Sequence, residues 1–447
     1  MCSIKLWSKL CALVFILSLV DACAPTQQEI EAEVVESVEQ EVPEAPDTYK
    51  TESDFGEIQI GWINTFNDAT LQKLVEEAQK NNKNLAAAAA NVDRSWSLAR
   101  QAGAALKPKI DLTSGAQNTS QSGASNLSLG AQISWELDLW GRIRTGAWAS
   151  QASAQAVEAD YRYAQHSLAA STAKAYFTSI EANLQSDIER ETVGILGETL
   201  RIVEVRFDNG LGSSQDVSLA RSDLALARER LTAADGAYRN ALRSLELLLG
   251  RYPGADIEVR ASLPTVPPPP PVGIPSELLE RRPDIVAAER RVAAAFNATE
   301  QAKVARLPTI GLTSNLGGAS NSLSGVLSSG NTSWSLGLNL LAPLFDGGVL
   351  REQVEIATAD QKQSLALYGD AALKAFGELE NTLDQGVVVT KRQIDLAEAA
   401  SEADEAYRVA NLNYQAGETD LLSVLIIQQR VISTKRNLST LKRLLLE

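Results

Sequence analysis

The side chains that most often perform catalysis or bind metals are sparse in this sequence. Its single histidine, His166, lies in an alanine-rich stretch, and no Asp, Glu, Cys or second His stands three or four positions away. The sequence contains neither a G-x-x-x-x-G-K-[ST] phosphate loop nor a G-x-S-x-G nucleophile motif. We therefore predict a protein that is not an enzyme and uses no cofactor, with His166 exposed or packed rather than reactive.

One cluster of charged residues has the composition of a binding or catalytic site. Arg281 and Arg282 precede Pro283 and Asp284. A carboxylate directly after a proline at a helix start accepts free backbone N–H groups and stabilises the positive end of the helix dipole. We therefore predict that this cluster has a structural role, with Asp284 capping a helix.

A third candidate for chemistry is Cys23. Residues 1–22 combine Lys5 and Lys9 with an apolar run over 10–20, which is too short for a spanning helix of about 20 residues and is typical of a signal peptide. Ala22 before Cys23 resembles the lipobox of bacterial lipoproteins, in which the cysteine is acylated, for example with palmitate, although Asp21 is atypical there. Cleavage without a lipid is the alternative. The mature chain keeps one cysteine, which excludes disulfides and a cysteine metal cluster.

The net charge of −15 is concentrated near the N-terminus, where residues 24–57 contain 11 acidic residues and only one basic residue, Lys50. This composition predicts a disordered, lipid-anchored acidic linker over 23–60. No basic stripe is present that would favour nucleic acid as a partner.

The chain is internally duplicated. Gln101-Ala102, Pro108 and Leu112-Thr113-Ser114 recur 200 residues later, and beyond them the offset becomes 207. We predict one repeat over 61–250, a second over 277–447, and between them a stiff Pro-rich linker over 251–276.

Each repeat ends in a heptad pattern behind a glycine-containing turn. Apolar residues from Val217 to Leu248 are spaced three and four apart, and the same pattern runs from Val424 to Leu445. A strict 3.5-residue repeat favours coiled-coil packing. The turns at 207–210 and 414–417 would therefore be the tips of two helical hairpins.

Each repeat also contains two predicted strands. Apolar and polar residues alternate over 127–139 and 334–340, and each run follows a partner strand that begins after Pro108 or Pro308. This alternation is typical of transmembrane barrel strands, and a half-buried soluble hairpin is the alternative. Four strands cannot close a barrel, and open edges are not tolerated in the hydrocarbon layer, so spanning strands would require an oligomer.

Very long helices follow the strands, because residues 142–207 and 349–414 contain no proline. Sixty-six helical residues would extend roughly 100 Å, the length of a duct rather than of a compact domain. The expected fold class is a mixed α/β membrane protein: a duplicated β-β-long-helix repeat with four transmembrane strands and long coiled helices.

The stretch Pro275-Ser-Glu-Leu-Leu-Glu-Arg-Arg-Pro-Asp-Ile285 resembles a characteristic stretch of the TolC-type outer-membrane efflux proteins, particularly their NodT-like lipoprotein branch. Leu137–Gly141 and Pro343–Gly348 resemble the strand-to-helix exits of that family. The resemblance extends over about residues 60–447.

The resemblance implies a homotrimer in the outer membrane, with a 12-stranded β-barrel and a 12-helix periplasmic tunnel. Its partners would be outer-membrane lipid, a periplasmic membrane-fusion adaptor and an inner-membrane pump of the RND type. The implied function is passive conduction of small hydrophobic or amphipathic compounds to the exterior. A duct for type I protein secretion and a coiled-coil scaffold without a pore remain the alternatives.

The resemblance also implies a constriction at the periplasmic tips. Asp216 and Tyr414 match a pair that links neighbouring helices in the closed state. Where relatives carry ring-forming aspartates, this chain has Ser423 and Ile426, so we expect a less acidic constriction gated by Ile426, with Asp420 giving residual cation preference. The full predicted set of tip residues is Gly210, Gly212, Asp216, Tyr414, Gly417, Glu418, Asp420, Ser423 and Ile426.

Overall fold

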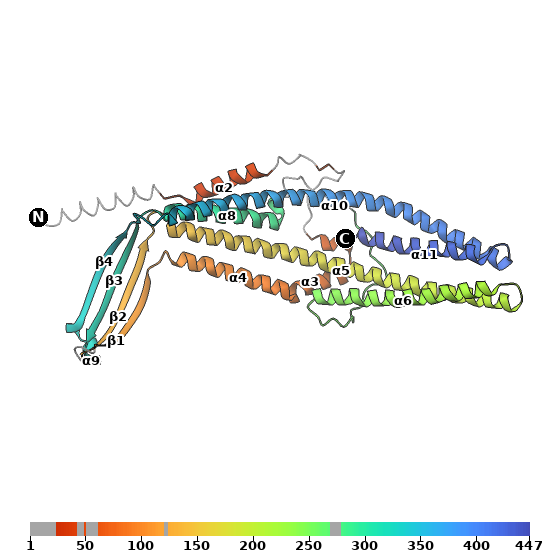
Figure 1. The fold of residues 1–447 in the computed structure, drawn as a ribbon, viewed down its shortest axis with the longest axis horizontal. Helices are drawn as coiled ribbons and strands as arrows, with labels where there is room; N and C mark the ends of the chain where they lie inside the picture. The colour runs from red at the N-terminus through yellow and green to blue at the C-terminus, as the bar shows by residue number, and fades with distance from the viewer. Residues whose placement is uncertain (1–23, 43–48, 51–60, 120–123, 269–278) are drawn as a thin grey trace. The chain divides into compact units, whose positions relative to one another are not determined.

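The computed structural model describes residues 24–42, 49–50, 61–119, 124–268 and 279–447 (Figure 1). The chain divides into two compact units. Unit 1 contains Met1–Ala45, Ala89–Arg162 and Leu279–Ala375, and unit 2 contains Pro46–Ala88, Tyr163–Leu278 and Phe376–Glu447. No helix within the described ranges combines the length and apolar character needed to cross a bilayer.

Unit 1 contains one antiparallel sheet in the order β1-β2-β3-β4, drawn together in Figure 1. Its strands are β1 (Lys109–Thr119), β2 (Ala124–Leu137), β3 (Thr309–Ser320) and β4 (Thr332–Leu341). All four predicted strands are therefore confirmed. Two short helical segments, α9 (Leu323–Val326) and η3 (Ser329–Asn331), lie in the connection between β3 and β4.

The two repeats meet in this sheet where β2 pairs with β3. Gly130 is the partner of Gly317 in that register. A Cβ atom on Gly317 would lie only 2.7 Å from the Cα atom of Gly130. Glycine at these positions therefore permits the close approach of the strands.

Long helices leave the sheet at two equivalent points. Helix α5 (Arg142–Asp208) follows β2, and helix α10 (Val349–Ala416) follows β4. The carboxylate of Asp138 accepts hydrogen bonds from the backbone N–H groups of Ile143 and Arg144, both at 2.8 Å. Asp346 does the same for Leu350 at 2.7 Å. Each repeat thus uses an aspartate to satisfy backbone donors at the start of its long helix.

Helices α4 (Lys83–Ala104) and α8 (Pro283–Val304) precede β1 and β3 in the two repeats. The hydroxyl of Thr299 in α8 donates to the backbone carbonyl of Ala357 in α10 at 3.1 Å. Gln301 of α8 lies directly against Gly146 of α5, where a Cβ atom would be 2.6 Å from the Gln301 amide nitrogen. Small residues therefore allow the helices of unit 1 to pack closely.

The N-terminal segment differs from the disordered linker expected over 23–60. Residues Gln27–Glu41 form helix α2, which begins with a capping box between Thr26 and Glu29. Ile30, Val34 and Val38 are buried, and α2 packs against α8 (Figure 1). The expectation of disorder was wrong here because apolar residues four apart form one helical face despite the surrounding acids.

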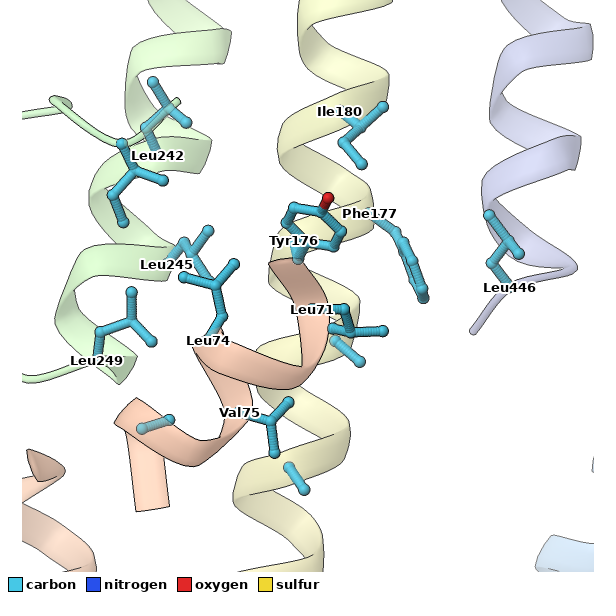
Figure 2. Packing of buried hydrophobic residues seen from close by; sticks show 14 residues of the cluster. Leu71, Leu74, Val75, Tyr176, Phe177, Ile180, Leu242, Leu245, Leu249 and Leu446 are labelled. Atoms are coloured by element: carbon cyan, nitrogen blue, oxygen red, sulfur yellow. The ribbon is translucent and has the colours of Figure 1, made fainter. Parts of the chain in front are cut away.

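Unit 2 is built around a hydrophobic core that combines residues of α3 (Ala69–Asn81), α5 and α6 (Ser214–Leu248) with Leu446 near the C-terminus (Figure 2). Helix α3 follows the short turn η2 (Trp62–Phe66) and contributes Leu71 and Leu74. Tyr176 and Phe177 of α5 are fully buried. Helix α6 and the residues after α11 (Leu421–Leu444) complete the core.

The described part of the predicted Pro-rich linker, residues 251–268, contacts this core. The buried carboxylate of Glu246 accepts hydrogen bonds from the backbone N–H groups of Ala255 and Asp256, both at 2.7 Å. Arg260 forms an ion pair with Asp68 at 3.1 Å. This part is therefore a packed segment held by specific polar contacts, in addition to connecting the two repeats.

Candidate functional site

The turn between α5 and α6 is the first predicted tip. Gly210 has a φ of +74°. The N–H of Gly210 donates to the carbonyl of Phe207 at 2.9 Å, and the N–H of Leu211 donates to that of Arg206 at 2.8 Å. Glycine adopts this left-handed conformation without the steric cost that a Cβ atom would add. At Gly212 a Cβ atom would lie 3.3 Å from the backbone nitrogen of Phe207.

Asp216 belongs to the N-terminal cap of α6. Its carboxylate accepts a hydrogen bond from the backbone N–H of Ser213, and the Ser213 hydroxyl accepts one from the N–H of Asp216, both at 3.1 Å. This reciprocal capping box ends the turn and fixes the direction in which α6 leaves it.

The second tip, between α10 and α11, repeats the same backbone design. Gly417 has a φ of +82°, and the N–H of Glu418 donates to the carbonyl of Asn413 at 2.8 Å. Asp420 caps α11 by accepting a hydrogen bond from the N–H of Ser423 at 3.0 Å. Hydrogen bonds from the Ser423 hydroxyl and backbone lower the pKa of the exposed Asp420 carboxyl, so Asp420 is ionised at neutral pH.

The two tips are joined by Arg206 and Tyr414. The Nη1 of Arg206 donates to the backbone carbonyl of Tyr414 at 2.9 Å, and its guanidinium lies 4.9 Å from the centre of the Tyr414 ring. Tyr414 is buried; burial raises the pKa of its phenol, Asp216 adds to this, and Arg206 opposes it. A guanidinium over an aromatic ring adds electrostatic attraction to the hydrogen bond.

An apolar cluster lies directly behind these contacts. It combines residues of α5 and α6 with residues of α10 and α11: Leu196, Val203, Val217, Ala220, Leu224, Ala227, Ala410, Tyr414, Leu421, Val424 and Leu425. The predicted heptad positions Val217, Leu224 and Val424 are therefore packed between the hairpins, as coiled-coil positions require.

The remaining predicted tip residues are on the surface of the single chain. Glu418 and Asp420 are exposed, Ser423 is half-buried, and Ile426 has 55% of its surface exposed. The structure of one chain brings Tyr414 and Asp216 to the same region but pairs them with Arg206 and Ser213, respectively. Their function as a gate stays a prediction.

Arg206 is the residue that sequence reasoning missed. The available signal was a cation in the last turn of α5, where positive charge is favoured by the helix dipole. That signal does not identify Tyr414 as its partner, because the two residues are 208 positions apart.

The Arg281–Asp284 cluster contains an ion pair between Arg282 and Asp284 at the start of α8, and its assignment to a structural role stays a prediction. Arg282 donates two hydrogen bonds to the Asp284 carboxylate, at 2.7 and 3.0 Å, while Pro283 opens α8. Burial opposes ionisation of Asp284, yet Arg282 and backbone N–H groups lower its pKa. Asp284 therefore has Arg282 as a partner in addition to the backbone N–H groups at the start of α8.

The other chemical candidates form no site in the described part of the chain. His166 is exposed on α5. No group of three or more His, Cys, Asp or Glu residues suited to a metal ion occurs among the described residues. Cys23 lies outside the described residues.

Comparison with known proteins shows which family the chain resembles. A family model described as "Outer membrane efflux protein" matches residues 74–251 and 274–447. The pyoverdine export outer membrane protein OpmQ of Pseudomonas aeruginosa is 29% identical over 84% of this chain and 82% of its own length. The probable efflux pump outer membrane protein TtgC of Pseudomonas putida is 30% identical over 89% of this chain and 84% of its own. The solved outer-membrane channel OprN has a TM-score of 0.82 at 28% identity, covering 91% and 96% of the two chains.

Proposed function

The chain belongs to the outer membrane efflux protein family, and on that premise we propose that three copies form an exit duct for small hydrophobic or amphipathic compounds. Its relatives are outer-membrane channels of efflux pumps, so the chain is a channel of the outer membrane and not an enzyme. The family assignment thus confirms the expectation of a protein without a cofactor.

The open sheet is the observation that carries the proposal of an oligomer. Strands β1 and β4 are its two edges, and large apolar side chains on them are highly exposed, with Leu112 at 78%, Trp334 at 77% and Leu338 at 68%. Unpaired strand edges are not tolerated in the hydrocarbon layer. Three copies of this four-stranded sheet would close a barrel of 12 strands, with the apolar side chains toward lipid.

The energy for transport would come from partners. The relatives are named as components of efflux pumps, which implies an adaptor and an inner-membrane pump, and we assign the pump to the RND type. One relative is named for export of pyoverdine, which favours small-molecule cargo over protein secretion.

The two hairpin tips would form the periplasmic gate of this duct. Gly210, Gly212 and Gly417 reverse the chain there, the exposed Ile426 would line the constriction, and the ionised Asp420 would favour cations. Bilayer recordings on Asp420→Asn and Ile426→Ala test this assignment. We expect weaker cation preference in the first and higher conductance in the second. If both variants behave as the wild type does, the constriction lies elsewhere.

Acylation of Cys23 would anchor the chain to the outer membrane. Incorporation of labelled palmitate by the wild type but not by Cys23→Ala is the expected result. A mature N-terminus without lipid would favour simple signal cleavage instead.

The decisive experiment is accumulation of a hydrophobic fluorescent dye in cells that lack this protein, compared with cells in which it is restored. Higher accumulation in the deletion, reversed on restoration, supports small-molecule efflux. Equal accumulation, together with loss of a secreted protein from the medium, would identify a protein-secretion duct.

A further inference from the structure

A buried amide with unmet hydrogen-bonding capacity lies close to the second tip. Gln428, about two turns into α11, is only 3% exposed. Among the described residues, neither its Nε2 nor its Oε1 has a hydrogen-bond partner. Buried polar groups are nearly always partnered. Because both atoms are already covered within one chain, a neighbouring copy cannot reach them unless the packing around them first opens.

The surroundings of Gln428 on its own helix are apolar. Val424 and Leu425 precede it by one turn, and Val431 and Ile432 follow by one turn; all four are buried. No alternative polar group is therefore available on the same face of α11.

Helix α5, which packs against α11, is also apolar at the level of Gln428. Helices α5 and α11 are antiparallel, because Gln185 donates to Ser439 at 2.7 Å and Arg443 donates to Glu181 at 2.5 Å. Continued toward the tip, this register places Leu196 of α5 opposite Gln428. Leu196 is itself 2% exposed. The interface between α5 and α11 therefore changes from paired polar residues to an apolar layer that contains one unpaired amide.

In the first hairpin, the residue equivalent to Gln428 has a hydrogen-bonding partner. With the offset of 207 residues between the repeats, Gln428 corresponds to Arg221, and Asn411 corresponds to Glu204. Arg221 and Glu204 form an ion pair at 2.8 Å between α6 and α5. In the second hairpin, the ion pair of Asp404 with Lys435 sets a register that places Asn411 opposite Gln428, yet Gln428 remains unpaired.

We propose that Gln428 tunes the gate by lowering the cost of separating α11 from α5, which raises the population of the conducting state. In the packed state, the amide is shielded from solvent and has no protein partner among the described residues, which costs free energy. Separation returns water to it, whereas the apolar neighbours are destabilised by the same exposure. Gln428 thus offsets part of the free-energy cost of separating α11 from α5. This shifts the equilibrium between the packed and the separated state toward separation. This inference rests on the proposed duct gated at its tips.

The test uses the full-length protein carrying Gln428→Leu, which keeps a similar volume and removes the unpaired groups. We expect an open probability in lipid bilayers about tenfold lower than in the wild type, and about tenfold slower amide hydrogen exchange over residues 421–432. Gln429→Leu, at the adjacent exposed position, is the matched control and should change neither quantity.

A second variant keeps the test informative if leucine perturbs folding. Gln428→Glu nearly preserves shape but buries a charge, so it should shift both quantities in the opposite direction. Exchange in Gln428→Leu that is as fast as in the wild type, or slower exchange with unchanged open probability, would overturn the proposal. If the wild type itself conducts no current, the duct fails as a function, whereas the exchange data still measure the effect of Gln428 on packing.

Discussion

Asp68 connects three parts of unit 2 through one buried carboxylate. Its Oδ1 accepts hydrogen bonds from the N–H groups of Thr70, at 2.9 Å, and Leu71, at 3.2 Å, which caps α3. Its Oδ2 accepts from the Tyr176 hydroxyl and from Arg260, both at 3.1 Å. Asp68 is 2% exposed. One residue therefore holds α3, the middle of α5 and the 251–268 segment together.

Asp68→Asn should lower the free energy of unfolding by about 2–3 kcal/mol, because asparagine still caps α3 but leaves Arg260 without its charged partner. Urea unfolding of the solubilised protein, followed by circular dichroism, measures this change. Asp93→Asn removes an exposed carboxylate of α4 and should be neutral within about 0.5 kcal/mol. An equal loss in both variants would contradict the assigned role of Asp68.

Asp68 also predicts a pH dependence. Burial opposes its ionisation, but hydrogen bonds from Leu71, Arg260, Tyr176 and Thr70 outweigh it and lower its pKa below the ordinary value of 3.8. The unfolded chain therefore binds this proton first as pH falls. The stabilisation is complete above about pH 5, begins to fall as pH approaches the unfolded-state pKa, and is lost as pH falls through the folded-state pKa. Acid titration of stability should show a shallower loss in Asp68→Asn than in the wild type.

At the scale of elements, α2 shows how an acidic segment becomes part of a packed unit. Val34 is 3% exposed while the adjacent Val35 is 51% exposed, so one valine lies on the buried face of the helix and the other on its exposed face. The backbone of α10 is also approached closely, because a Cβ atom on Gly369 would lie 3.0 Å from the Cγ atom of Glu41.

Val34→Asp should detach α2 from unit 1, because a carboxylate would replace a buried methyl surface at a cost of about 3 kcal/mol or more. Limited proteolysis should cleave within residues 27–41 at least tenfold faster than in the wild type. Val35→Asp places the same charge on the exposed face and should leave the cleavage rate unchanged. Equal rates in the two variants would show that α2 is not held by its apolar face.

Replacing a glycine by alanine should have opposite effects on stability at the tip of α10 and in its interior. Gly417→Ala should destabilise the second tip by about 1 kcal/mol, because a residue with a Cβ atom is strained at φ +82°. Gly386 lies inside α10, and no neighbouring group comes within 4 Å of the position that a Cβ atom would occupy there. Gly386→Ala should therefore stabilise the helix by up to about 1 kcal/mol. Amide hydrogen exchange should become faster at residues 414–420 in the first variant and slower around 386 in the second.

At the scale of the whole molecule, the open sheet makes assembly a requirement of the proposed function. Leu338 and Asn339 are adjacent in β4 and project to opposite faces of the sheet. Only the Leu338 face would meet lipid in a closed barrel.

Leu338→Lys should therefore reduce assembly in the outer membrane, at a cost of about 2–4 kcal/mol for each lipid-facing charge. Asn339→Lys, on the other face, is the matched control. Native mass spectrometry of the solubilised wild type should give the mass of three chains. Full assembly of Leu338→Lys, or a wild-type complex with another number of chains, would contradict the proposed barrel.

The features that the sequence determined are those encoded by short-range patterns. Alternating residues predicted two strands, and Pro108 and Pro308 marked the start of their partners. A 3.5-residue repeat predicted the coiled helices, and glycines marked both tips. Each pattern depends on residues close together in the chain. For α2 the local signal was also present: Ile30, Val34 and Val38 are four apart and follow the Thr26–Glu29 capping box. The high acidic content obscured it.

Only the tertiary structure decided which distant residues meet. Arg206 pairs with Tyr414, Arg260 pairs with Asp68, and Gln428 is buried without a partner among the described residues. Each of these facts depends on the register between helices that are far apart in sequence, and a change of one turn in that register would alter every partner. Periodicity specifies which face of a helix is buried, whereas packing against a particular neighbour specifies what that face contacts.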